Sequence, residues 1–218
     1  MSTHFLKLID ELTRRSLRMA SAVEDMLLEA SDAVRRVDHA LARRIIDRDE
    51  EIDQEEVAIE TEVLRLMTLF QPMGTNMRQL CTVLKVNNDL ERVADCAVNI
   101  AERVRHLSQE AVEQARTELK DIYPVVRRML HDAIRAYATA DEEIARRVRA
   151  EDETIDAFYG DFVRRTCAQA DRSPDSMNAY LDILSVAKSL ERIADLASNI
   201  AEDVIYLVTG QIVRHRPS

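Results

Sequence analysis

A repeated helical motif constrains the fold of this chain more than any other feature of its sequence. The stretch LERVADCAVNIAE, from Leu90 to Glu102, returns one hundred residues later as LERIADLASNIAE, from Leu190 to Glu202. Over the wider windows 83–107 and 183–207, fourteen of twenty-five positions are identical. Similarity of this strength at a fixed offset indicates an internal duplication, so the 218 residues favour two similar halves.

Apolar residues in both copies recur at the spacing of an amphipathic helix. Alternating steps of four and three turn one apolar face toward a core. In the first copy that face comprises Val86, Leu90, Val93, Ala97, Ile100, Val104 and Leu107. Three Gly, four Pro and no Trp leave few helix breakers, so we expect helices throughout and no sheet.

Turn residues divide the first half into three helices. Apolar spacing predicts a first helix from Phe5 to about Val37, and Asp38 is a suitable N-cap for the second. The sequence Gln71-Pro72-Met73-Gly74 interrupts the pattern, so the third helix begins near Thr75.

The second half repeats this order. Its second and third helices are separated by a turn at Asp171-Arg172-Ser173-Pro174, and Gly210 ends the last helix. The boundary between the halves is expected near Ser108, with a nearly continuous helical link. We therefore predict an all-α fold of two tandem three-helix bundles, residues 1–108 and 109–218.

Carboxylates meet across the second and third helices of each half. A short turn makes these helices antiparallel neighbours, so residues equidistant from the turn lie at the same level. Asp49 and Asp95 are equidistant from Pro72, as are Asp53 and Glu91. In the second half Asp152 is paired in this way with Asp195, and Asp156 with Glu191.

Four like charges at one level repel, and a bound cation would relieve that repulsion. Oxygen ligands favour hard ions such as Mg²⁺, Mn²⁺, Ca²⁺ or oxidised iron over zinc in a thiolate site. Small neighbours such as Ala94, Ala97 and Ala101 are expected to keep the site open to solvent. The predicted metal ligands are Asp49, Asp53, Glu91, Asp95, Asp152, Asp156, Glu191 and Asp195, with Asn99, Glu102, Asn199 and Glu202 as possible additions. The alternative is an ordinary solvated helix face, whose acids pair with Arg48, Arg92 or Arg192.

Composition excludes several other classes of function. Forty acidic residues against thirty Lys and Arg give a net charge of −10, which argues against nucleic acid as a partner. Three cysteines without CxxC spacing and an N-terminus without an apolar signal core indicate the cytoplasm. No apolar run is long enough to insert into a membrane. No nucleophile-base pair or Gly-rich phosphate loop is visible, so we expect no enzyme activity.

Along its whole length the chain resembles the PhoU family of phosphate-transport accessory regulators. The resemblance rests on the doubled LER-x-AD…NIAE motif and on the Asp-x-x-Ile-Asp sequence in the second helix of each half. It implies two three-helix bundles, metal bound by the doubled carboxylate motifs, and a homodimer. It also implies a cytoplasmic negative regulator that links the ATPase subunit of the phosphate ABC transporter to a membrane sensor histidine kinase.

Two other classes compete with this interpretation. A carboxylate-bridged iron enzyme or iron store would normally need Glu-x-x-His ligands, and none of the five histidines has Glu three residues before it. A metal-free structural adaptor would keep the apolar faces and tolerate loss of the acids. The metal itself remains open among Mg, Mn, Fe and Zn.

Overall fold

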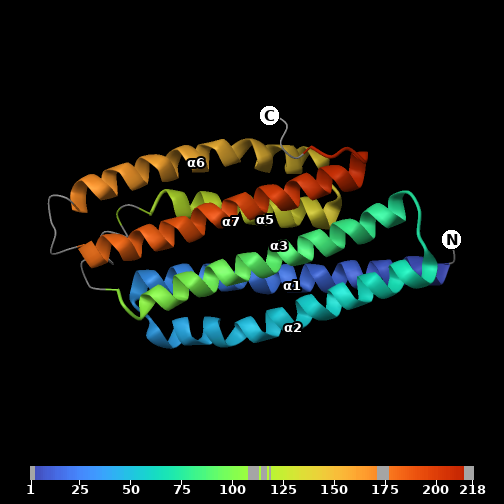
Figure 1. Ribbon diagram of the computed structural model, residues 1–218, viewed down its shortest axis with the longest axis horizontal. Helices are drawn as coiled ribbons and strands as arrows, with labels where there is room; N and C mark the ends of the chain where they lie inside the picture. Colours follow the sequence, from blue (N-terminus) through green and yellow to red (C-terminus); the bar gives the residue numbers. More distant parts are fainter. Residues whose placement is uncertain (1–2, 108–112, 114–116, 118, 171–176, 214–218) are drawn as a thin grey trace.

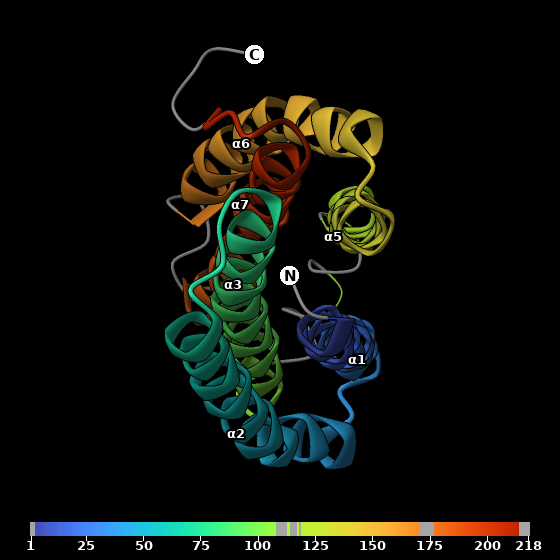
Figure 2. The ribbon, with the colours of Figure 1, turned by 90° about the vertical axis from the view of Figure 1, so that its right-hand side faces the viewer.

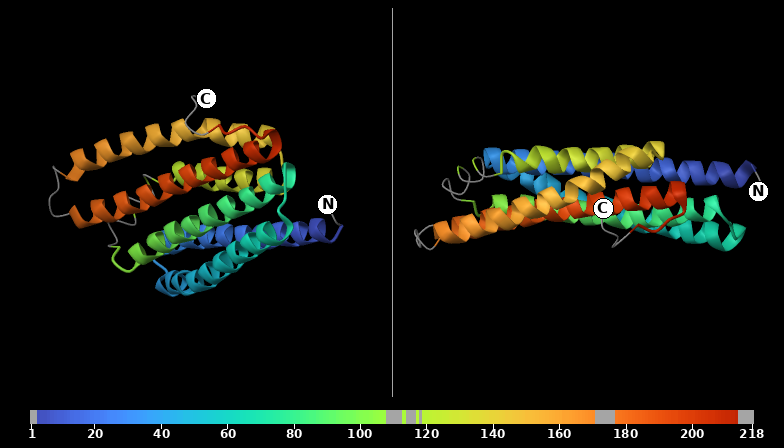
Figure 3. Two further views of the ribbon diagram at one scale, coloured as in Figure 1. Left: turned by 45° about the vertical axis from the view of Figure 1, so that its right-hand side comes forward. Right: turned by 90° about the horizontal axis from the view of Figure 1, so that it is seen from above.

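In the part of the chain that the structure describes, six long helices run side by side and form an elongated, flattened arrangement (Figures 1 and 3). The structure is a computed structural model that describes residues 3–107, 113, 117, 119–170 and 177–213. The helices are α1 (Thr3–Arg36), α2 (His39–Phe70), α3 (Thr75–Val104), α5 (Ile122–Thr139), α6 (Glu142–Ala170) and α7 (Met177–Thr209). Within these described ranges no residue lies in a strand, as the sequence predicts.

The helix ends lie where the turn chemistry predicts them. Asp38 caps α2, since its side chain accepts hydrogen bonds from the amides of Ala40 and Leu41. Gln71 ends the same helix in the left-handed conformation, with φ of 44°. Gly210, at φ of 75°, ends α7 and donates its amide hydrogen to the carbonyl of Tyr206.

The link between the halves differs from the expected continuous helix. Helix α3 ends at Val104, and the amide of His106 donates a hydrogen bond to the carbonyl of Arg103 just beyond it. The predicted boundary at Ser108 and the predicted turn at Asp171 to Pro174 lie outside the described residues.

Helices α3 and α7 form the centre of the molecule. α1 and α2 pack on α3, α5 and α6 pack on α7, and α3 packs on α7 as extensively as on its own neighbours (Figure 2). The two repeat motifs therefore lie side by side, and Leu90 and Leu190 belong to one continuous core. Truncating Leu90 to Ala would cost roughly 2–5 kcal/mol of stability, since it is fully buried.

Two ion pairs join the halves across this central contact. Lys85 on α3 lies 2.8 Å from the carboxylate of Asp203 on α7, whose side chain is almost completely buried. Toward the other end, Arg103 on α3 lies 4.0 Å from Asp182 on α7. The two contacts show that α3 and α7 run antiparallel, because Lys85 precedes Arg103 while Asp203 follows Asp182.

The central position of α3 and α7 corrects one expectation. Ala94, Ala97 and Ala101 were expected to flank an open surface, but all three are fully buried. The reason is that α3 contacts α1, α2 and α7 at once, which leaves only a narrow stripe of the helix for solvent. Their counterparts on α7 are buried in the same way: Ala194, Ala197 and Ala201.

Candidate metal centres

The first carboxylate cluster, Asp49, Asp53, Glu91 and Asp95, is built where α2 packs on α3. Burial, as the largest cause, and the negative charges of Asp53 and Asp95 together raise the pKa of Asp49 to about 6. Because Asp95 acts on Asp49 from the opposite helix, the structure brings together the two residues that are equidistant from Pro72.

Glu91 joins the same cluster from α3. Burial raises its pKa to about 7, with smaller contributions from Asp95, Asp53 and Glu56. The side chain is half-buried, while Asp53 and Asp95 are exposed. The cluster thus has a partly desolvated inner edge and an outer edge that solvent reaches.

The second carboxylate cluster, Asp152, Asp156, Glu191 and Asp195, lies where α6 packs on α7. Oxygens of Asp156, Glu191 and Asp195 all lie within 4.8 Å of one another. Burial raises the pKa of Asp195 to about 6, followed by the charges of Glu191 and Asp152. Burial also raises the pKa of Asp152, and the charges of Asp156 and Glu191 add to the rise. All four carboxylates therefore lie close enough to act on one another electrostatically.

The arginines that could neutralise the first cluster pair with other acids. Arg48 lies 2.9 Å from Glu29, and Arg92 lies 3.4 Å from Asp89. Neither of these contacts involves Asp49, Asp53, Glu91 or Asp95. These two contacts therefore do not neutralise the carboxylates of the first cluster.

The second cluster has a lysine side chain, Lys188, where the first cluster has no basic residue. Nζ of Lys188 lies 2.6 and 2.8 Å from the two carboxylate oxygens of Glu191. The same lysine lies over the ring of Tyr159, 5.1 Å from its centre. The repeat places Asn88 at the corresponding position of the first half.

A second basic residue distinguishes the halves. Nε of Arg149 lies 3.1 Å from Glu202, one of the possible additional ligands. The repeat places Ile46 where the second half has Arg149. Lys188 and Arg149 were not among the predicted site residues, because only the acids of the two copies were compared. A comparison of the basic residues at the same offsets would have found them.

The additional residues fall in different places. Glu102 is exposed and close enough to Asp49 to raise its pKa, so it borders the first cluster. Asn99 is exposed. Asn199 instead lines a cavity of about 390 Å³ on the first half, together with Glu60 and Arg92. It therefore faces α2 and α3 across the central contact.

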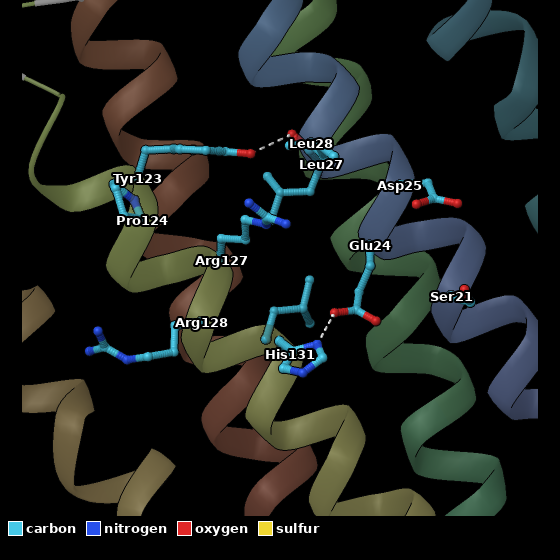
Figure 4. Close-up of a pocket in the computed structure, with 11 residues that line it drawn as sticks. Ser21, Glu24, Asp25, Leu27, Leu28, Tyr123, Pro124, Arg127, Arg128 and His131 are labelled. Atoms are coloured by element: carbon cyan, nitrogen blue, oxygen red, sulfur yellow. Dashed lines mark hydrogen bonds and ion pairs between the residues drawn. The ribbon is translucent and has the colours of Figure 1, made fainter.

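A separate recess of about 460 Å³ lies between α1 and α5, with Arg127 and Tyr123 on its α5 side (Figure 4). Nδ1 of His131 on α5 lies 3.0 Å from Glu24 on α1 and bridges this recess. The carboxylate clusters belong to the other helix pairs, α2 with α3 and α6 with α7. This recess thus adds no ligand to them.

The two clusters have the donor chemistry of sites for hard cations. Every donor is a carboxylate oxygen, and the close trio on α6 and α7 contains neither His nor Cys. Mutual repulsion, together with burial, makes protons bind more tightly than usual, and a multivalent cation relieves the same repulsion. The residues present therefore fit such a metal.

These features define the class as an all-helical protein with two repeats and a carboxylate cluster on each. The family profile described as the PhoU domain matches the chain twice, at residues 16–104 and 119–204. The chain belongs to the PhoU family.

Relatives and solved structures agree with this assignment. The chain is 35% identical to the phosphate-specific transport system accessory protein PhoU homolog of Pseudomonas putida, covering 99% of this chain and 84% of the relative. The chain is also similar to the crystal structure of PhoU from Pseudomonas aeruginosa, with a TM-score of 0.88 and 31% sequence identity. The alignment covers 95% of this chain and 100% of that chain. The phosphate transport system regulatory protein PhoU from Streptococcus pneumoniae is 28% identical, with a TM-score of 0.89 over 96% and 99%.

Proposed function

We propose that this chain is a non-enzymatic regulator of phosphate homeostasis that binds metal cations at its two carboxylate clusters. Membership of the PhoU family supports the regulatory role, since similar proteins are named accessory proteins of a phosphate-specific transport system. The observation that carries the metal sites is the trio of carboxylates from α6 and α7 with oxygens within 4.8 Å. The first cluster supports the same role through its raised pKa values and its uncompensated charge.

In this proposal the protein acts in the cytoplasm, restrains phosphate uptake and represses the phosphate-starvation response. It does so by linking the ATPase subunit of the phosphate ABC transporter to a sensor histidine kinase. The protein acts as a homodimer, and each chain has two structural units, residues 1–108 and 109–218. Among the described helices, none is long and apolar enough to cross a bilayer. Contact with the transporter would then run through its ATPase subunit.

The residues of each cluster would hold the cation between two antiparallel helices. Asp49 and Asp53 on α2 with Glu91 and Asp95 on α3 would bind one, and the matching acids on α6 and α7 the other. A bound cation supplies positive charge that turns repulsion between the helices into attraction. Binding should therefore stabilise each pair of helices.

Thermal unfolding of chelator-treated protein, with Mg²⁺, Mn²⁺, Zn²⁺ or Fe³⁺ added back, tests the metal sites. At a hundred times its dissociation constant, a ligand adds about 2.7 kcal/mol per site, or several degrees in melting temperature. Glu91→Gln with Asp95→Asn should raise the melting temperature of the metal-free protein and abolish the metal-induced rise from the first half. Asp47→Asn with Glu50→Gln, which removes two exposed acids of α2 that do not belong to the cluster, should change neither.

If no ion raises the wild-type melting temperature beyond that of the cluster variants, the clusters are only surface charge. The regulatory role has a separate test in the host cell. Deleting the gene should increase phosphate uptake and phosphate-starvation transcripts at high external phosphate. Unchanged uptake and transcripts would contradict the regulatory role, whatever the metal result.

A further inference from the structure

Exposed apolar side chains gather at one end of the molecule. Leu69 at the end of α2, Met73 in the turn and Met77 at the start of α3 are 62%, 80% and 39% exposed. Ile212, just beyond α7, is 63% exposed. We name these four residues, together with Leu6 and Val208, the apolar tip. Large exposed side chains concentrated in one region commonly mark a contact surface.

Contacts between helices hold the tip together. The rings of Phe5 on α1 and Phe70 on α2 lie 4.7 Å apart. Nε of Arg78 on α3 donates to the carbonyl of Leu207 at the end of α7, at 3.3 Å. The start of α1, the turn between α2 and α3, and the end of α7 therefore meet at the same end of the molecule (Figure 1).

The tip region has no acidic residue in a chain that has forty. No Asp or Glu occurs in residues 1–9, in 63–88 or in 204–218. The basic residues Lys7, Arg65, Arg78 and Lys85 lie in the described part of these segments, and Lys85 pairs with Asp203. Arg65 pairs with Glu62, which lies one residue before the second segment, while Arg78 bonds to a carbonyl and a hydroxyl and keeps its charge. The tip thus combines apolar and positive groups, which complement an anionic surface.

The shape and length of the molecule favour a lipid surface as the occupant. Met73, which is 80% exposed, lies in the turn between α2 and α3, so the tip suits a broad, deformable partner better than a narrow helix. Asp53, the nearest acid of the first cluster, precedes Phe70 by seventeen residues, or about 26 Å of helix. That distance exceeds the screening length of about 8 Å at physiological salt, so this cluster adds little repulsion at the tip. Of the acids nearer the tip, Asp10, Glu62 and Asp203 pair with Arg14, Arg65 and Lys85.

We propose that the apolar tip docks end-on to an anionic lipid bilayer, without spanning it. Leu69, Met73 and Ile212 enter the headgroup region, and Lys7 and Arg78 lie at the level of the lipid phosphates. This contact is independent of the carboxylate clusters. It brings the protein to the surface on which any membrane-bound partner would lie.

Co-sedimentation with vesicles tests the proposal. Wild-type protein should bind phosphatidylcholine vesicles that contain phosphatidylglycerol, and should bind pure phosphatidylcholine vesicles weakly. Met73→Glu with Ile212→Glu should reduce binding about tenfold or more, because it places two negative charges in the contact. The matched control, Val57→Glu with Leu181→Glu, adds the same charge at side chains that are 60% and 55% exposed outside the tip, and should bind nearly as well as wild type.

Three outcomes would overturn the proposal. The first is equal binding of wild type to both kinds of vesicle, or none, which would leave a protein as the occupant of the tip. The second is equal loss of binding in the control pair, which would indicate only net charge. The third is full binding by the tip variant. Thermal melts of each variant establish that it is folded, so loss of binding cannot reflect unfolding.

Discussion

Replacing Lys188 with asparagine, the residue that the repeat places at position 88, should tighten cation binding at the second carboxylate cluster. Lys188 contacts both carboxylate oxygens of Glu191, so it places a positive charge beside the position that a bound cation would take. It holds the metal-free carboxylates together and also opposes the arrival of a metal. Asparagine removes the positive charge and keeps a polar side chain of moderate size.

The size of the effect follows from the distances. Nζ of Lys188 lies 2.6 Å from an oxygen of Glu191. A hard cation binds a carboxylate oxygen at about 2.1 Å, so the two positive charges would lie within about 5 Å. In a water-like dielectric an ammonium group and a divalent cation at this distance repel by about 1.5–2 kcal/mol. The lysine side chain is more than half exposed, so screening and side-chain motion reduce this to about 1 kcal/mol, or about fivefold in Kd.

Calorimetric titration with Mn²⁺ can isolate the second cluster if the first is disabled by Glu91→Gln with Asp95→Asn. In that background Lys188→Asn should lower the Kd about fivefold. Lys188→Arg keeps the charge and should leave the Kd unchanged. Lys7→Asn controls for net charge and should also have no effect. A Kd unchanged by Lys188→Asn, or lowered equally by Lys188→Arg, would refute the reasoning.

Two further predictions concern pH and the central contact. The raised pKa values of Asp49, Glu91 and Asp195, about 6 to 7, mean that the folded protein binds protons more tightly than the unfolded chain. The resulting stabilisation is fully present below about pH 4, near the ordinary pKa of these carboxyls, and is lost as pH rises from there through 6 to 7. Melting temperatures of the metal-free protein should therefore fall between about pH 4 and 7, and a flat profile would contradict this. Lys85→Met should destabilise the protein by about 1–3 kcal/mol in urea unfolding, because it removes the charged donor 2.8 Å from the buried Asp203. Lys85→Arg should retain most of that stability, and equal loss in both variants would contradict the ion-pair argument.

The helices and the carboxylate clusters could be predicted because the information is local. The spacing of apolar residues determines which residues form a helix, and Asp38, Pro72 and Gly210 mark where helices end. A short turn then fixes which residues face each other, so Asp49 meets Asp95 without any knowledge of the rest of the fold.

The packing of the two halves could not be predicted in this way. Periodicity shows that a helix has a buried face, but it does not identify which helix covers that face. The alanines of α3 were therefore assigned to the surface, although they lie in the core. The contact of Lys85 with Asp203 was missed for the same reason, because 118 residues separate the two in the sequence.

The ion pairs between α3 and α7 determine which halves can associate. The repeat aligns Arg103 with Asp203, so the two copies have opposite charges at this position. Two first halves packed in the same way would place Lys85 against Arg103, and two second halves would place Asp182 against Asp203. Only one half of each kind gives opposite charges at both contacts. The duplicated halves have thus become complementary partners, and an exchange of halves between two chains could only rebuild the same unlike pair.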